Sequence, residues 1–401
     1  MVSFDVEYLR KLSPKLFDEL TSVDFESIRS KISSRNQGFL EMLDDEDNVK
    51  RIQSFAKSQK KWEHIIILGI GGSALGPACL YDTFHMLYSM PKCTVLDTID
   101  PIFLDHEFNK LELNKTLFIV ISKSGTTPET VAQYAYIKEK LGKNTDALII
   151  ITGSTGYLRD ESIKNNIPCF DIPENVGGRF SVLSSVGLLP AALLGIDIKQ
   201  LIEGAKLMRQ NYQLETVEKN LPFLLAHIWN TFSMDLVFFP YANSLQKFAD
   251  WNKQLIAESL GKEGKGLTPI TALGATDQHS QLQLFSEGPN NKLYMFFDVK
   301  HLEKDLSIPT IEDKNLSYLS DITFGELLSA ELHGTMEALA TMKRPLIKIS
   351  IDTLSPQELG SLFVLFECTV AILAEIWNID AFNQPGVELS KRVTKDILCK
   401  K

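Results

Sequence analysis

Four hydroxyl side chains, a lysine and a glycine occupy the six residues 122–127, in the order Ser-Lys-Ser-Gly-Thr-Thr. Hydroxyl groups and the Lys123 ammonium are hydrogen-bond donors that suit a phosphate. An apolar run at 117–122 precedes this cluster, and Pro128, which favours the first position of a helix, follows it. A strand thus leads into a donor-rich turn and a helix N-terminus, where free N–H groups and the helix dipole attract an anion. A capped loop with a solvated lysine is the alternative.

A second apolar run, at 65–68, leads into the glycine-rich turn Gly69-Ile-Gly-Gly-Ser-Ala74. This turn fits the G-x-G-x-x-G/A fingerprint of dinucleotide-binding proteins, and Asp97 follows at about the expected distance. However, Ser73 places a hydroxyl beside Gly72 in the turn, and the other donor-rich loop adds more donors. These features favour a small, hydroxylated anion, and a dinucleotide oxidoreductase is the weaker alternative.

Arg179 follows two glycines, the second of which is Gly178. Glycine lets the backbone approach a ligand closely, and the guanidinium offers a rigid fork of donors. A surface turn with an arginine paired to Glu174 is the alternative.

Further along, Gln254 and Glu258 are four residues apart in a helical pattern and share one face. A carboxylate held there could act as a general base, although such a glutamate is more often solvated.

His279 lies in a polar loop, 274–280, after an apolar run. An imidazole can transfer a proton near neutral pH, although a lone loop histidine is more often structural. Near the C-terminus, Gln384 sits in a predicted turn and Lys391 in the helix expected after it. A lysine at that place normally faces solvent.

The composition is that of a globular protein, with 401 residues, 44% of them hydrophobic and a net charge of −10. This length allows two domains with separate cores. The acidic balance argues against nucleic-acid binding, which needs a basic face. Five widely spaced cysteines without a CxxC pair are typical of a reducing compartment, so we expect a cytoplasmic location. Charges interrupt residues 1–20, so no signal peptide is expected, and the apolar stretch 180–196 is expected to be a buried helix and not a membrane span.

Short apolar runs alternate with helical patterns along most of the chain. Residues 1–60 are polar and helix-patterned, and then runs occur at 65–68, 94–98, 117–122, 147–152 and 168–172. This alternation predicts a parallel sheet with helices on both faces, whose ligands bind at the carboxyl ends of the strands. More candidate strands follow at 235–240, 268–272, 293–299 and 346–351. We therefore expect a helical segment, 1–60, and two α/β domains, 61–203 and 204–401.

Taken together, six segments resemble the glucose-6-phosphate isomerase family and occur in the family's order. The matching segments are 69–76, 122–130, 174–190, 240–262, 274–280 and 384–391. The most specific are Gly-Gly-Arg-Phe-Ser and Gln-Pro-Gly-Val-Glu-Leu-Ser-Lys. The resemblance implies two doubly wound sugar-isomerase (SIS) domains, each with a five-stranded parallel sheet of flavodoxin-like order. It also implies a homodimer whose active sites lie at the subunit interface.

The resemblance further implies a role for each candidate residue. The phosphate clamp would consist of Ser122, Lys123, Ser124 and Thr127, supported by Gly72 and Ser73. Glu258 would move a proton between sugar carbons C2 and C1, and Arg179 would stabilise the enediolate between them. His279, lent by the neighbouring subunit, and Lys391 would open the sugar ring. Gln254 and Gln384 would line the sugar pocket, and Gly178 would also contact the substrate.

The implied reaction is the reversible isomerisation of glucose 6-phosphate and fructose 6-phosphate, which serves glycolysis and gluconeogenesis. A positioned carboxylate can remove the proton next to a carbonyl and contributes a factor of about 10²–10⁴ to the rate. This proton-transfer route requires neither a metal nor a cofactor. The chain also has no HxxH or HExxH pair. One departure is Leu260, where the family often has asparagine.

Two alternatives stay open within this resemblance. A non-catalytic SIS-type regulator that binds sugar phosphate would keep the 122–127 loop, but it would not need Glu258, His279 and Lys391 together. An isomerase that also acts on mannose 6-phosphate would keep all of them.

Overall fold

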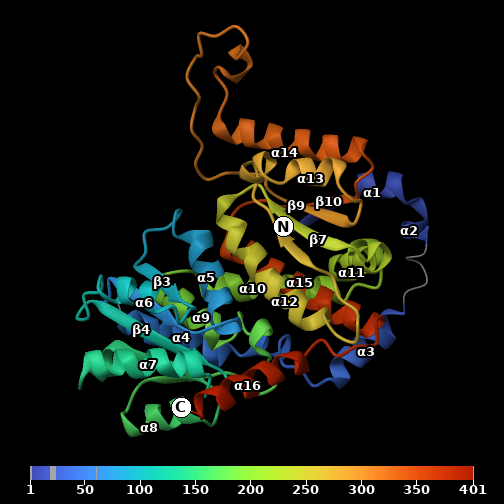
Figure 1. The fold of residues 1–401 in the computed structure, drawn as a ribbon. Helices are drawn as coiled ribbons and strands as arrows, with labels where there is room; N and C mark the ends of the chain where they lie inside the picture. The colour runs from blue at the N-terminus through green and yellow to red at the C-terminus, as the bar shows by residue number, and fades with distance from the viewer. Residues whose placement is uncertain (1, 19–23, 60, 401) are drawn as a thin grey trace.

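The computed structural model describes residues 2–18, 24–59 and 61–400. The chain forms two lobes, each built around one sheet, with a group of helices between the sheets (Figure 1). The fold is α/β with doubly wound sheets, as predicted. Below, the lobe that contains β2 to β6 is called the first lobe, and the other is called the second.

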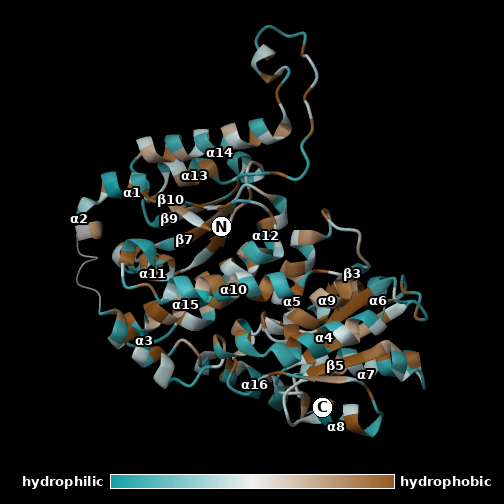
Figure 2. Cartoon of the chain, turned by 180° about the vertical axis from the view of Figure 1, so that it is seen from behind, coloured by the Kyte–Doolittle hydropathy of each residue, from teal (hydrophilic) through white to brown (hydrophobic). Residues whose placement is uncertain are grey.

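The first sheet has five parallel strands in the order β3-β2-β4-β5-β6. Its strands are β2 (His64–Leu68), β3 (Lys92–Leu96), β4 (Thr116–Ser122), β5 (Leu148–Thr152) and β6 (Cys169–Asp171). Every residue of β4 and β5 is buried because helices cover both faces, which is why these strands are continuous apolar runs. Figure 2 shows hydrophobic strands in this lobe. The flavodoxin-like order is confirmed here.

The second sheet has four parallel strands and one antiparallel strand, in the order β1-β10-β9-β7-β8. Its strands are β1 (Ser3–Asp5), β7 (Asp235–Pro240), β8 (Pro269–Thr271), β9 (Lys292–Val299) and β10 (Leu346–Ile351). Ser3 pairs with Ser350, so the fifth strand comes from the N-terminus and runs antiparallel to β10. The expectation of five parallel strands in each sheet is therefore wrong for this one, and the N-terminal segment is not wholly helical.

Helices cover the outer face of each lobe and fill the space between the two sheets (Figure 1). Those of the first lobe are α4 (Glu46–Ser58), α5 (Gly72–Phe84), α6 (Pro101–Phe108), α7 (Pro128–Leu141), α8 (Tyr157–Lys164) and α9 (Ser185–Leu194). Between the sheets lie α10 (Ile198–Tyr212), α11 (Leu221–Phe232), α12 (Gln246–Leu260) and α15 (Pro356–Ile376). The outer face of the second sheet is covered by α13 (Leu282–Glu287) and α14 (Phe324–Thr341). The remaining helices are α1 (Glu7–Leu12), α2 (Pro14–Asp18), α3 (Phe25–Ser34) and α16 (Glu388–Leu398).

One hydrophobic core runs through both lobes, and a smaller one lies beneath α13 and α14. The large core includes α9, so the stretch 180–196 does contain the predicted buried helix. Because α5 of the first lobe packs against α12 of the second, the two lobes share side-chain contacts. The predicted domain boundary at 203/204 falls within α10 and stays a prediction.

Helix α15 is a long apolar helix of 21 residues that has no counterpart among the elements predicted from the sequence. It is long and apolar enough to cross a membrane, but 94% of its most apolar window is buried inside the protein. Burial of this kind is typical of a core helix, and the aromatic rings of Phe363 and Phe366 pack on Phe248 of α12.

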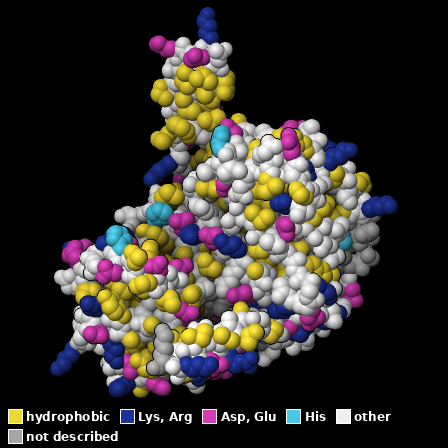
Figure 3. Space-filling view, viewed as in Figure 1, with side chains coloured by type: hydrophobic (Ala, Val, Ile, Leu, Met, Phe, Trp, Pro, Cys, Tyr) yellow, Lys and Arg dark blue, Asp and Glu magenta, His cyan; other side chains and the backbone are white. Residues whose placement is uncertain are grey.

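A long arm, residues 300–323, projects from the second lobe between β9 and α14 (Figures 1 and 3). Its base is held by an isolated bridge between Ser307 and Thr323. Large apolar side chains stand exposed along it, with Leu306 and Tyr318 about 70% exposed. No sequence pattern had predicted this arm.

Candidate active site

Arg179 and Glu258 form an ion pair between the two lobes. Arg179 lies in the 3-10 turn Gly178–Phe180, and its Nη1 donates to Glu258 Oε2 at 3.1 Å and to Gln384 Oε1 at 2.7 Å. Its Nε donates to Ser259 Oγ at 2.8 Å. The arginine side chain is 1% exposed and that of Glu258 is 32% exposed. Burial lowers the pKa of Arg179 from its ordinary value, and the charge of Glu258 opposes this shift. Arg179 and Glu258 thus form a preorganised pair in which the guanidinium is buried and the carboxylate is accessible to a ligand.

Helix α12 orients the carboxylate of Glu258. Leu255 and Ile256 are fully buried and fix this part of the helix in the core. Gln254 precedes Glu258 by one turn, and its Nε2 donates to Glu258 Oε1 at 3.0 Å, so Gln254 and Arg179 each contact one carboxylate oxygen. Among the described residues, Gln254 Oε1 is buried and has no hydrogen-bond partner. The acceptor capacity of this atom is therefore unused in the described chain.

The glycine-rich turn of the first lobe contacts this cluster through backbone atoms. A β-carbon on Gly72 would lie 2.2 Å from the carbonyl oxygen of Gly178, and one on Gly71 would lie 2.9 Å from Gln254 Nε2. Gly71 also has a φ of 59°, which favours glycine. A β-carbon on Gly178 itself would meet nothing within 4 Å. A close approach of the Gly178 backbone to a ligand was expected. In the structure, the Gly178 carbonyl lies against Gly72 of the protein itself, and this contact requires glycine at position 72.

The donor-rich loop 122–127 has the predicted strand–turn–helix form. It begins at the end of β4, and Ser122 Oγ and Thr127 Oγ1 are 2.9 Å apart. Ser124 Oγ accepts from the Thr126 backbone N–H at 3.2 Å, and Gly125 makes the turn with a φ of 65°. The Thr127 side chain makes no capping bond to α7. The first turn of α7 therefore keeps N–H groups for an anion.

Lys123 is partly buried at this loop. Its Nζ donates to the backbone carbonyl of Glu174 at 2.9 Å. Burial lowers the pKa of Lys123 from its ordinary value, and the charge of Glu174 opposes the shift. Because β2 and β4 are adjacent, the N-terminus of α5, with Gly72 and Ser73, lies at the same sheet edge as this loop. Two helix N-termini and an ammonium thus share one edge.

The loop that carries His279 is firmly braced. Asp277 accepts from the backbone N–H of Leu273 at 2.7 Å, and Gln278 Nε2 donates to Tyr241 Oη at 2.6 Å. His279 itself is exposed. In the part of the chain described here, it makes no hydrogen bond or ion pair with Glu258, and the fold holds it on the outside of its own lobe.

Lys391 is also exposed, on helix α16. Its Nζ contacts Glu388 Oε1 at 2.8 Å, and its side chain is 62% exposed. Within the described chain, no hydrogen bond or ion pair joins it to Arg179 or Glu258. Of the predicted catalytic residues, a single chain thus brings together Arg179 and Glu258, with Gln254 and Gln384 beside them, but it does not join His279 and Lys391 to them.

Sequence reasoning missed two side chains at the cluster. Ser259 accepts from Arg179, and Lys262 Nζ donates to the backbone carbonyls of Ser259 and Asp380. Both follow Glu258 within the matched segment 240–262, but nothing in their spacing indicates a contact with residues so distant in the chain.

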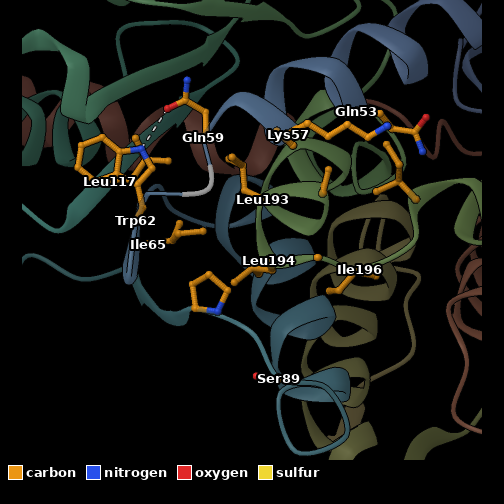
Figure 4. A pocket seen from close by; sticks show the side chains of 15 residues that line it. Gln53, Lys57, Gln59, Trp62, Ile65, Ser89, Leu117, Leu193, Leu194 and Ile196 are labelled. Carbon is orange, nitrogen blue, oxygen red and sulfur yellow. Dashed lines mark hydrogen bonds between the residues drawn. The ribbon is translucent and has the colours of Figure 1, made fainter.

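A separate cavity of about 460 Å³ lies at the opposite edge of the first sheet (Figure 4). Its walls include Ile65 and Leu117, near the amino ends of β2 and β4, and Leu194 at the end of α9. Trp62 Nε1 donates to Gln59 Oε1 on its wall at 3.0 Å. The cavity is distinct from the predicted site, because no predicted site residue lines it.

The two doubly wound sheets and the helices on their faces form the SIS-domain type of fold, which is found in phosphosugar isomerases. A solved structure with this fold is tagatose-6-phosphate ketose/aldose isomerase from Escherichia coli, with a TM-score of 0.54 over 92% of this chain and 96% of that one, at 15% identity. The chain belongs to the phosphoglucose isomerase family, whose profile matches residues 34–309 and 329–401. The gap in this match contains the outer part of the arm.

Individual relatives agree with this membership. The probable glucose-6-phosphate isomerase of Methanococcus maripaludis is 37% identical over 95% of this chain and 89% of that protein. The glucose-6-phosphate isomerase of Methanocaldococcus jannaschii is 34% identical over 98% of each. The crystal structure of a hypothetical protein from Thermus thermophilus has a TM-score of 0.93 and 32% identity, covering 99% of this chain and 100% of that one.

Proposed function

We propose that this chain is a glucose-6-phosphate isomerase in which Glu258 transfers the proton between C2 and C1. The observation that supports this most is the geometry of Glu258: one carboxylate oxygen contacts the buried guanidinium of Arg179, and the other contacts Gln254. A carboxylate held in this way is oriented and partly open to a substrate. Membership of the family supplies the substrate pair, glucose 6-phosphate and fructose 6-phosphate.

In the proposed reaction, Glu258 takes the proton from the carbon next to the carbonyl and returns it to the other carbon. Negative charge develops on oxygen meanwhile, and Arg179 stabilises it. A preorganised donor in such a position contributes about 2.7–4 kcal/mol if it behaves like an oxyanion-hole donor. This route uses no metal. Among the described residues no three His, Cys, Asp or Glu side chains gather as metal ligands, and the absence of a metal stays a prediction.

The phosphate of the substrate would bind at the carboxyl edge of the first sheet. The supporting features are the hydroxyls of Ser124 and Thr127, the Lys123 ammonium and the two helix N-termini. Phosphate binding does not take part in bond-making, but it holds the reacting carbons against Glu258. Gln254 Oε1 and Gln384 would contact the sugar hydroxyls.

His279 and Lys391 would open the sugar ring, and His279 would come from a second copy of the chain. The exposure of His279 on a braced loop supports this, because a rigid surface histidine can reach a neighbouring subunit. The exposed apolar side chains of the arm, Leu306 and Tyr318 among them, also favour burial against another protein surface. We therefore propose a homodimer, located in the cytoplasm, without nucleic-acid or membrane partners.

The deciding experiment is a coupled assay. Purified protein is incubated with fructose 6-phosphate, NADP⁺ and glucose-6-phosphate dehydrogenase, and the reduction of NADP⁺ to NADPH is followed. An isomerase produces NADPH without an added metal for its own step, whereas a sugar-phosphate-binding regulator produces none. Replacing the substrate with mannose 6-phosphate tests the dual specificity.

A further inference from the structure

Lys262 and Arg179 hold the same stretch of backbone from two sides. Lys262 Nζ donates to the carbonyls of Asp380 and Ser259, the latter at 3.0 Å. Arg179 Nη2 donates to the carbonyls of Ala381 and Asn383, the latter at 2.9 Å. The two cations therefore satisfy three carbonyls within residues 380–383, which would otherwise need water or another donor.

This stretch of backbone places a residue of the candidate site. It connects α15 to α16 and leads directly to Gln384, whose Oε1 accepts from Arg179 Nη1 at 2.7 Å. Ser259 joins both cations, because its Oγ accepts from Arg179 and its carbonyl accepts from Lys262. A displacement at Asp380 would be transmitted to Gln384 and to the guanidinium.

We propose that Lys262 is a positioning residue that fixes the backbone of residues 380–384, and thereby sets the arrangement of Gln384 and Arg179 beside Glu258. Lys262 does not touch the reacting atoms. The expected effect of Lys262 on kcat rests on the proposed function. Its effect on the backbone of residues 380–384 can be measured independently of that function.

The charge of Lys262 is sensitive to pH near neutrality. The charged groups that face it are Arg179 from the 3-10 turn, Glu258 from α12 and Asp380 from the held backbone. Burial, reinforced by the positive charge of Arg179, lowers the pKa of Lys262 to about 8. The charged form is therefore present below about pH 8 and is lost as the pH rises through this value. Because a charged donor binds a carbonyl more strongly than a neutral one, the positioning weakens on the alkaline side.

The test compares Lys262→Met and Lys262→Arg with a matched control, Lys265→Met. Lys265 also donates to a backbone carbonyl at the end of α15, that of Trp377, but it shares no partner with Arg179. We expect Lys262→Met to lower kcat about tenfold or more with a small change in KM, because misplacement of a preorganised group affects the chemical step. Lys262→Arg should keep most of the activity, and Lys265→Met should change kcat less than about twofold.

The pH profile separates positioning by charge from a merely structural role. Wild-type kcat should fall above about pH 8, and Lys262→Arg should lack that fall because arginine stays charged. Hydrogen–deuterium exchange of the peptide covering residues 377–391 gives a readout without turnover, and Lys262→Met should exchange faster there than Lys265→Met. If Lys262→Met does not fold, the pH profile of Lys262→Arg decides the matter.

The outcomes distinguish this inference from the proposed function. A wild-type protein that shows no isomerase activity, while Lys262→Met still loosens residues 377–391, would refute the function and leave the positioning role standing. If wild-type protein isomerises and Lys262→Met matches it in kcat and in exchange, the inference is overturned. It is also overturned if Lys262→Arg keeps the alkaline fall of the wild type.

Discussion

Gly72 and Gly178 meet so closely that a β-carbon on Gly72 would lie 2.2 Å from the Gly178 carbonyl oxygen. This contact joins the glycine-rich turn of the first lobe to the 3-10 turn that carries Arg179. The edge proposed to bind phosphate and the Arg179–Glu258 pair are thus coupled through backbone atoms. Relaxation of a side chain cannot relieve a clash at this contact.

The first prediction follows from that contact. Gly72→Ala should force the two backbones apart, lower kcat/KM about tenfold or more and reduce the melting temperature. Steady-state kinetics and thermal melts measure both effects. Gly334→Ala in α14 is the control, because its β-carbon would meet nothing within 4 Å, and it should leave kinetics unchanged. If the Gly72→Ala protein had the kinetics of the wild type, the contact between Gly72 and Gly178 would not be needed for activity.

The second prediction concerns Glu258. Glu258→Gln keeps the shape of the side chain but removes its basicity, so kcat should fall about 10²-fold or more while sugar-phosphate binding is nearly kept. In deuterated water, wild-type protein should place solvent deuterium at the transferred position, and the variant should lose this exchange together with isomerisation. Glu139→Gln, on the exposed face of α7, is the control. Near-wild-type turnover of Glu258→Gln would exclude Glu258 as the base.

The third prediction concerns the phosphate loop. Thr127→Ala removes a hydroxyl that contacts Ser122 Oγ at 2.9 Å and lies at the N-terminus of α7. A loop that binds the substrate phosphate would do so equally in the ground and transition states, so KM should rise severalfold with little change in kcat, and Thr127→Ser should restore KM. A collapse of kcat at unchanged KM would contradict the clamp assignment.

The fourth prediction concerns assembly. If His279 serves the site of the neighbouring subunit, His279→Ala and Glu258→Gln proteins should each be inactive. Mixed and refolded together, they should regain part of the wild-type activity, because each heterodimer has one complete site. Native mass spectrometry verifies that heterodimers form. Zero activity in the presence of heterodimers would place both residues in the site of one chain.

The fifth prediction concerns Glu367, which is fully buried in α15 and whose two carboxylate oxygens lack hydrogen-bond partners in the described chain. Burial raises the pKa of Glu367 well above its ordinary value. The folded state then holds a proton that the unfolded state releases, so stability falls as the pH rises above the ordinary pKa of glutamate. Glu367→Met should raise the melting temperature, more at about pH 8 than at about pH 5. Glu139→Met should show no such pH dependence.

Much of the fold is visible in the sequence, for a physical reason. The central strands β2, β4 and β5 are short apolar runs because helices bury both of their faces, and turn residues bound them. Strand β1 could not be predicted, since the three residues Ser3–Asp5 carry no pattern and pair only because β10 offers a free edge. Likewise, the glycines at 71 and 72 look like a ligand-binding fingerprint, whereas their close contacts are with Gln254 and Gly178.

Only part of the site could be predicted from the sequence, because many of its contacts are tertiary contacts. Gln254 and Glu258 could be paired from their spacing, because a helix fixes which residues share a face. The contacts of Arg179 with Gln384, and of Lys262 with Asp380, join residues far apart in the chain, so no local pattern indicates them. The resemblance implies that His279 and Lys391 act at the active site, but a single chain does not bring them together with Arg179 and Glu258.

The antiparallel pairing of β1 with β10 also bears on the order in which the protein can fold during synthesis. Ser3 leaves the ribosome long before its partner Ser350, because the first lobe and most of the second lie between them in the chain. The first lobe, whose five strands lie between His64 and Asp171, can assemble early from neighbouring segments. Once β10 has been made, its edge stays open until the earlier segment Ser3–Asp5 pairs with it, and an open edge presents unpaired backbone groups to other chains.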